Sequence, residues 1–156
     1  MPDPEPTEVV AWANDLLEDA RVARLGLLDL KGAPRVLPVT FALADGRIWS
    51  AIDRKPKRSG EPARLRFLRR DPRAALTVDR YSEDWDHLAW VQVLGRVSIV
   101  EVTEGRAGLE ALSAKYEPYR EEAPPGPLLA IQPERYLWWR AEDLEGRDAR
   151  SGDRGG

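Results

Sequence analysis

The sequence predicts a mainly β domain in which about six antiparallel strands are flanked by helices. Three observations lead to this fold class. Apolar and polar residues alternate from Trp90 to Val102, the pair Asp45-Gly46 is a strong hairpin signal, and apolar residues recur at helical spacing only before, between and after the expected strands. Strands this short commonly close into a small barrel, which removes exposed edges. With 156 residues, the chain has room for one hydrophobic core.

The first third of the chain predicts a helix followed by an antiparallel meander. Apolar residues recur at helical spacing over residues 9–20, and the hydroxyl of Thr7 can cap the first free amides. Three strands in succession then form the meander, because turn residues at 31–34 and 45–46 separate them. The expected strands are 24–30, 35–42 and 48–53.

The rest of the chain predicts two helices and four strand segments. Residues 59–62 supply capping and first-turn residues for a helix in which Leu65 and Leu68 face inward. The second helix follows Thr103. Gly95 lies inside the most regular strand, where a glycine indicates a bulge or the close approach of another backbone or ligand. The expected strand segments are 74–81, 90–102, 128–131 and 135–140.

Composition changes at both ends of the predicted domain. Residues 1–7 are acidic and rich in proline, and residues 145–156 contain Gly, Arg, Asp and Ser without an apolar anchor. We therefore expect an N-terminal tail at 1–7, a globular domain at 8–144 and a disordered C-terminal tail at 145–156. No run approaches the roughly 18 apolar residues of a membrane span, so we expect a soluble cytoplasmic protein.

The most unusual local feature is a basic segment in an acidic chain. Residues 54–73 hold nine basic and two acidic side chains, although the whole chain has a formal charge of -3. A basic island favours a local anionic ligand over nucleic acid, which the acidic remainder would repel. Because no Gly-rich phosphate loop is present, charged side chains must bind the anion. The available cations are Arg54, Lys55, Lys57, Arg58, Arg64 and Arg66.

The residues give little support to other catalytic chemistry. Without cysteine there is no disulfide, thiolate metal site or cysteine nucleophile. The single histidine, His87, cannot complete a zinc site, so we expect no metal. No serine lies in a Gly-x-Ser-x-Gly elbow. The six tryptophans suit core or interface packing, or else an indole, Trp90 or one of Trp138 and Trp139, closes over a planar ring.

Several motifs together resemble a known family. They are Leu37-Pro38-Val39-Thr40-Phe41, Ser50-Ala51-Ile52-Asp53-Arg54-Lys55-Pro56-Lys57-Arg58, Leu68-x-x-Asp71-Pro72-Arg73-Ala74 and Trp90-Val91-x-Val93-x-Gly95. Over residues 23–139, the chain resembles the actinobacterial deazaflavin-dependent branch of the pyridoxamine-phosphate-oxidase-like split-barrel superfamily. The resemblance implies a homodimeric split β-barrel that holds its cofactor in a cleft at the subunit interface.

The resemblance also implies which residues contact the cofactor. Pro38, Val39 and Thr40 form the strand that passes the isoalloxazine-type ring, Ser50 and Ala51 lie on the neighbouring strand, Lys57 and Arg64 clamp the phosphate, and Lys55 and Arg58 lie nearby. Tyr81 and Tyr119 are candidate proton donors, with solvent as the alternative.

Two departures from the family pattern bear on the cofactor. Leu37 and Ala42 stand where pyridoxamine phosphate oxidases carry Arg and Lys to hold FMN, and the Arg-x-His substrate signature is missing from residues 135–140. Vitamin B6 oxidation is therefore not expected. The basic loop, longer than in those enzymes, suits coenzyme F-420, whose phosphate and glutamates need several cations.

We therefore expect a coenzyme F-420-dependent oxidoreductase that transfers hydride between the deazaflavin and a small molecule. Three alternatives remain at this stage. They are an FMN-dependent oxidase or reductase on the same fold, a non-enzymatic protein that stores the cofactor, and a haem-binding relative with His87 as the ligand.

Overall fold

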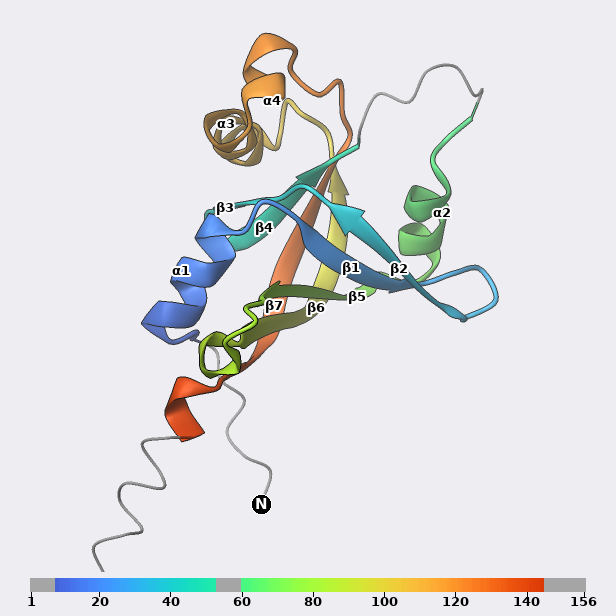
Figure 1. Ribbon diagram of the computed structural model, residues 1–156. Helices are drawn as coiled ribbons and strands as arrows, with labels where there is room; N and C mark the ends of the chain where they lie inside the picture. The colour runs from blue at the N-terminus through green and yellow to red at the C-terminus, as the bar shows by residue number, and fades with distance from the viewer. Residues whose placement is uncertain (1–7, 53–59, 145–156) are drawn as a thin grey trace, which may run out of the picture.

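The computed structural model describes residues 8–52 and 60–144 (Figure 1). In chain order, the elements are α1 (Ala11–Asp19), β1 (Ala23–Leu28), β2 (Pro34–Val39), β3 (Ala42–Ala44), β4 (Arg47–Ala51), α2 (Ala63–Arg70), β5 (Arg73–Arg80), the 3₁₀ helix η1 (Trp85–His87), β6 (Ala89–Val100), α3 (Arg106–Lys115), α4 (Glu117–Glu121) and β7 (Leu128–Arg140). The predicted tails at 1–7 and 145–156 lie outside the described residues. None of the helices in the described part of the chain is long and apolar enough to cross a membrane.

The strands form one seven-stranded antiparallel sheet in the order β2-β1-β5-β6-β7-β4-β3. Its two edge strands, β2 and β3, are separated in the sequence only by Thr40 and Phe41. In a flat sheet these edges would lie roughly 29 Å apart, at about 4.8 Å per strand. The three Cα steps from Val39 to Ala42 span at most about 11 Å. The sheet must therefore curl until its edges meet, which is consistent with a split β-barrel.

The mainly β fold class is confirmed, but two details of the strand prediction are wrong. The expected strand 35–42 is divided into β2 and β3, because the chain bends at Thr40 to pass from one sheet edge to the other. The meander is interrupted at the same place, since β4 pairs with β7 rather than with β2. The predicted final strand pieces, 128–131 and 135–140, both lie in the strand β7.

Helix α1 also begins later than predicted. It starts at Ala11 with Val10 as its N-cap, and no side chain caps it. Thr7, the expected cap, lies outside the described residues. Helix α2 likewise begins after Pro62 without a side-chain cap. Helix α1 forms because of its apolar face, on which the buried residues Ala13 and Leu17 are four positions apart.

Two apolar clusters lie on opposite faces of the sheet. The larger one fills the inside of the curl, where strand residues such as Leu25, Leu76 and Val93 meet Leu65 and Leu68 of α2. The smaller cluster lies between α3 and the end of the sheet formed by β3, β4 and β7. Its members include Ala42, Trp49, Ala51, Leu112, Leu128 and Ala130. Strand β4 therefore has both faces covered, and all its residues after Arg47 are buried.

Gly95 occupies the irregular position that its place in the strand predicted. The pairing of β6 with β7 shifts between Leu94 and Gly95, so that β7 carries an extra residue at Glu134. A Cβ atom added to Gly95 would lie only 2.2 Å from the carbonyl oxygen of Gln132. The two backbones therefore approach closely because position 95 has no side chain.

Replacing Gly95 should destabilise the fold far more than replacing another strand glycine. Gly95→Ala should lower the free energy of unfolding by about 1–3 kcal/mol, because its Cβ meets backbone that cannot rotate away. Gly26→Ala is the matched control, since its Cβ would make only an ordinary 3.6 Å contact with the carbonyl oxygen of Ala75. Urea unfolding of both variants measures the difference. Equal losses would contradict the close-approach explanation.

Candidate functional site

The bend at Thr40 and Phe41, where the sheet closes, is held by hydroxyl groups. Ser50, which is 1% exposed, donates a hydrogen bond from Oγ to the Thr40 carbonyl at 2.7 Å. The Tyr116 hydroxyl accepts one from the Phe41 amide at 3.1 Å. The same hydroxyl lies within donor distance of two carbonyl oxygens, 3.0 Å from Phe41 and 2.9 Å from Arg21. Short polar contacts thus take up backbone groups that the bend removes from the strand ladder.

The side chain of Thr40 faces α4. Its Oγ1 lies 2.7 Å from the Tyr119 hydroxyl, and either atom can be the donor in this hydrogen bond. The Tyr119 ring also packs edge to face against Tyr116, with 5.6 Å between the ring centroids. Three residues singled out in the sequence, Thr40, Ser50 and Tyr119, are therefore brought together although they come from three separate segments.

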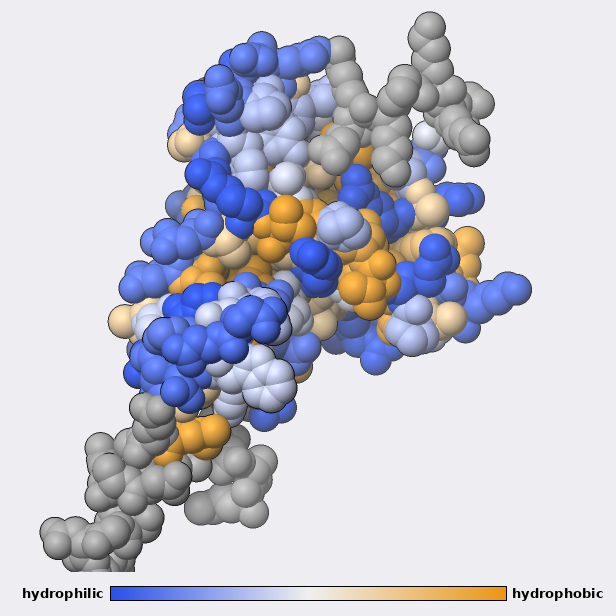
Figure 2. Space-filling view, in the orientation of Figure 1, coloured by the Kyte–Doolittle hydropathy of each residue, from blue (hydrophilic) through white to orange (hydrophobic). Residues whose placement is uncertain are grey.

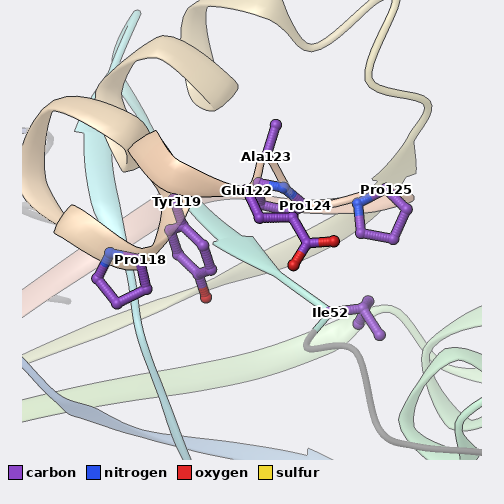
Figure 3. Close-up of a pocket in the computed structure, with 7 residues that line it drawn as sticks. All are labelled: Ile52, Pro118, Tyr119, Glu122, Ala123, Pro124 and Pro125. Carbon is purple, nitrogen blue, oxygen red and sulfur yellow. The ribbon is translucent and has the colours of Figure 1, made fainter.

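A small pocket opens beside this hydroxyl pair (Figure 3). Its volume is ≈ 160 Å³, below the range of roughly 300–1,000 Å³ for pockets that enclose a whole small-molecule ligand. It is lined by Ile52, Pro118, Tyr119, Glu122, Ala123, Pro124 and Pro125. Tyr119 reaches down from α4, and the Glu122 carboxylate points into the space above Ile52. The pocket thus combines apolar walls with one phenol and one carboxylate.

The remaining ring-contact candidates are arranged around the bend. Pro38 is exposed on the edge strand β2, where a residue without an amide proton is tolerated, and Val39 beside it is buried. Ala51 is buried in the cluster under α3, so its side chain has no free face. In the sequence, only the resemblance to the family motifs had indicated these positions.

The charged candidates are only partly described. Lys55, Lys57 and Arg58 lie outside the described residues. Arg64 lies in the first turn of α2 and is half-buried. In the sequence, the basic segment begins two residues after the pocket residue Ile52. Arg69 and Arg73 have carboxylate partners in Glu61 and Asp71.

Tyr81 and Trp90 belong to the part of the chain around β5 and β6. Tyr81 is 66% exposed, and its hydroxyl donates to Glu83 at 3.2 Å. It follows β5 and precedes η1 in the sequence. Trp90, 37% exposed, pairs across strands with Trp139, whereas Trp138 packs against the main core.

Within the described part of the chain, His87 belongs to no metal-binding cluster. Its Nδ1 lies 3.5 Å from a carboxylate oxygen of Asp84, and both side chains are more than half exposed. Among residues 8–52 and 60–144, no group of three His, Asp or Glu side chains is placed to hold a metal ion.

Sequence reasoning did not assign Lys115 or Tyr116, at the end of α3, to the candidate site. The Lys115 Nζ is buried without a hydrogen-bond partner and lies 4.0 Å from the centroid of the Phe41 ring. Burial lowers the pKa of Lys115 to about 8, and repulsion by Arg21 adds to this, while Asp19 and Glu18 oppose it. Burial also raises the pKa of Tyr116, so its phenol stays neutral and can donate and accept. Their spacing in the sequence carries no signal of these contacts.

A protein-family model covers most of the chain. The model, described as pyridoxamine 5'-phosphate oxidase, matches residues 11–140. No curated protein matches the sequence.

Solved structures with a similar fold are also found. Conserved hypothetical protein Rv2991 from Mycobacterium tuberculosis is 21% identical, with 92% of each chain covered and a TM-score of 0.69. A FAD-binding protein from Mesorhizobium loti is 20% identical over 83% of this chain and 94% of that one, with a TM-score of 0.61. An F420 reductase is 20% identical over 83% of this chain and 98% of that one, with a TM-score of 0.60. At these identities the likeness is one of fold.

Lys115 should make stability depend on alkaline pH. Because its pKa is about 8 in the folded chain and 10.5 ordinarily, the unfolded chain binds more protons between these values. The free energy of unfolding should therefore rise as the pH increases from 8 to 10.5. Lys115→Met should be more stable than the wild type at neutral pH by about 1–2 kcal/mol, less than the full shift implies because solvent screens the charge.

Denaturant unfolding at several pH values checks this, with the exposed Lys31→Met as the matched control. The advantage of Lys115→Met should shrink as the pH rises towards 10.5. An advantage that does not change with pH would show that the amine is not the cause.

Proposed function

We propose that this chain, which belongs to the pyridoxamine 5'-phosphate oxidase family, is an oxidoreductase that binds a flavin-type cofactor, coenzyme F-420, and transfers hydride between it and a small molecule. One observation carries the proposal: Thr40, Ser50 and Tyr119 meet where the sheet closes, beside a pocket residue, Ile52, that precedes the basic segment. The neutral hydroxyl groups would then lie beside the ring system of the cofactor, and the cations of the basic segment would bind its anionic tail.

The two apolar replacements favour coenzyme F-420 over FMN. Leu37 is half-buried on β2, and Ala42 is buried in the cluster under α3. Neither position offers the cation that FMN phosphate receives in pyridoxamine phosphate oxidases, according to the resemblance described above. The cations of the segment 54–66 come later in the chain and number six, which suits a longer anionic tail. Similarity in fold to an F420 reductase is compatible with this choice.

A bound deazaflavin would supply a hydride, and the chain's own residues would do the rest. The apolar wall formed by Ile52, Pro118 and Pro124 would exclude water from the reacting face. Tyr119 would give the proton that accompanies the hydride, because this residue lines the pocket and its hydroxyl is held by Thr40. Tyr81, exposed and bonded to Glu83, is the weaker candidate for this role.

We place the site at the interface of a homodimer. The pocket in one chain is too small for a tricyclic ring, so a second copy would have to supply part of the wall. A suitable surface exists on the sheet, where the cross-strand row Val36, Gly26, Ala75 and Leu94 stays partly or fully exposed. Val36 is 72% exposed, and Figure 2 shows hydrophobic side chains at the surface over β1 and β2. Sedimentation velocity measures the oligomeric state, and a protein that sediments only as a monomer would rule out this arrangement.

Fluorescence titration with coenzyme F-420 and FMN side by side tests the cofactor assignment. We expect micromolar or tighter binding of coenzyme F-420 and weaker binding of FMN. Arg64→Ala and Lys57→Ala should each weaken coenzyme F-420 binding by about 1.5–3 kcal/mol, the range for hydrogen bonds to charged groups. Arg69→Ala is the matched control, because Arg69 lies on the same helix and pairs with Glu61.

The titration, together with absorption spectra and activity assays, separates the alternative functions. Tight FMN binding with a flavin spectrum and oxygen consumption would favour an FMN-dependent oxidase. Tight binding of coenzyme F-420 without turnover of any electrophile would favour a storage protein. A Soret band that disappears in His87→Ala would favour haem binding. If the protein binds neither coenzyme F-420, FMN nor haem, the proposal is overturned.

Tyr119→Phe should lower turnover by about 100-fold or more if its phenol gives the proton, because general acid catalysis contributes this much. Cofactor affinity should change little, since the ring that lines the pocket is retained. Tyr81→Phe should leave turnover unchanged. Steady-state kinetics under saturating cofactor make the comparison, and normal turnover in Tyr119→Phe would leave solvent as the proton source.

A further inference from the structure

Tyr116 is the residue through which α3 holds the bend. Its hydroxyl contacts both backbone polar atoms of Phe41, the amide at 3.1 Å and the carbonyl at 3.0 Å. It also lies 2.9 Å from the Arg21 carbonyl. One phenol therefore links the end of α3 to the chain just before β1 and to the connection between β2 and β3. Because it carries a single proton, it donates to one of the two carbonyls at a time.

Three residues of the short segment 115–119 contact the bend. Lys115 lies over the Phe41 ring, and Tyr116 binds the Phe41 backbone. Tyr119, three residues further on, binds the Thr40 hydroxyl. The contacts of Tyr116 and Tyr119 fall on consecutive residues of the bend, and their rings touch. A shift of Phe41 would therefore move Thr40 relative to Tyr119.

We propose that Tyr116 is a positioning residue that holds Phe41, and with it Thr40, so that the Thr40 hydroxyl meets Tyr119 in the orientation needed for proton delivery. The inference rests on the proposed function, since it assigns Tyr116 a role in the step given to Tyr119. Tyr116 does not line the pocket. Its effect passes through Thr40, whose Oγ1 is the hydrogen-bond partner of the Tyr119 hydroxyl.

The alternative is that Tyr116 only stabilises the fold. Tyr136 offers a matched control, because its phenol is also half-buried and its pKa is likewise raised by burial. It lies on β7 and packs against the main core. A purely structural role predicts that Tyr116→Phe, like Tyr136→Phe, lowers the stability of the fold at most and leaves kcat and Tyr119 unchanged. A positioning role predicts that only the former affects Tyr119.

The experiment compares four cofactor-loaded proteins: Tyr116→Phe, Tyr119→Phe, the double variant and Tyr136→Phe. Tyr116→Phe should lower kcat by about 10- to 100-fold at nearly unchanged KM and cofactor affinity, which is the effect of a small misplacement. The double variant should be no slower than Tyr119→Phe, because both changes act on one step. Tyr136→Phe should retain wild-type kcat. Losses that multiply in the double variant would overturn the positioning role.

A readout without turnover separates this inference from the proposed function. The ring-carbon NMR signal of labelled Tyr119 in the cofactor-free protein should shift in Tyr116→Phe and stay in place in Tyr136→Phe. If the wild type binds no cofactor, the proposed function fails, yet the signal still reports whether Tyr116 positions Tyr119. An unmoved signal overturns the inference even in an active enzyme.

A second variant covers the loss of folding in Tyr116→Phe. Para-aminophenylalanine at this position keeps a ring with a donor and an acceptor, so it should restore both the Tyr119 signal and kcat to near wild-type values. A folded para-aminophenylalanine variant that shows the defect expected of Tyr116→Phe would contradict the proposal, because the bond to Phe41 would then not be what matters.

Discussion

A covalent constraint organises the whole structure: the two edge strands of a seven-stranded sheet are joined by only Thr40 and Phe41. Two residues cannot cross the width of a flat sheet, so the sheet has to curl. The curl creates an inside, which the larger apolar cluster fills, and an outside, part of which α3 covers. The candidate site follows from the same constraint, since it is built around the bend.

The bend has polar backbone groups in apolar surroundings, and this explains why hydroxyl residues gather there. Ser50 and Tyr116 supply hydrogen bonds to the backbone, which would otherwise be left without partners. Helix α3 comes close enough for this because Gly108 lies against Trp49, where a Cβ atom would fall 2.2 Å from the indole. Packing of the smaller cluster and geometry of the site are thus coupled.

Family membership and the site's chemistry bear on different questions. The family model, which matches residues 11–140, accounts for the fold. The choice between cofactors depends on particular side chains, because a shared fold hosts many chemistries. The proposal of coenzyme F-420 rather than FMN rests on apolar Leu37 and Ala42 together with the basic segment after Ile52.

The sequence by itself determined the features that depend on local spacing. Alternation marked β6, Asp45-Gly46 turns the β3–β4 hairpin with both residues at positive φ, and Gly95 lies at the bulge. Only the tertiary structure decided that β2 and β3 are opposite edges and that Thr40 meets Tyr119, 79 positions away. The physical reason is that local pattern encodes which residues face a core, whereas strand order and distant hydroxyl pairs arise only when the whole sheet closes.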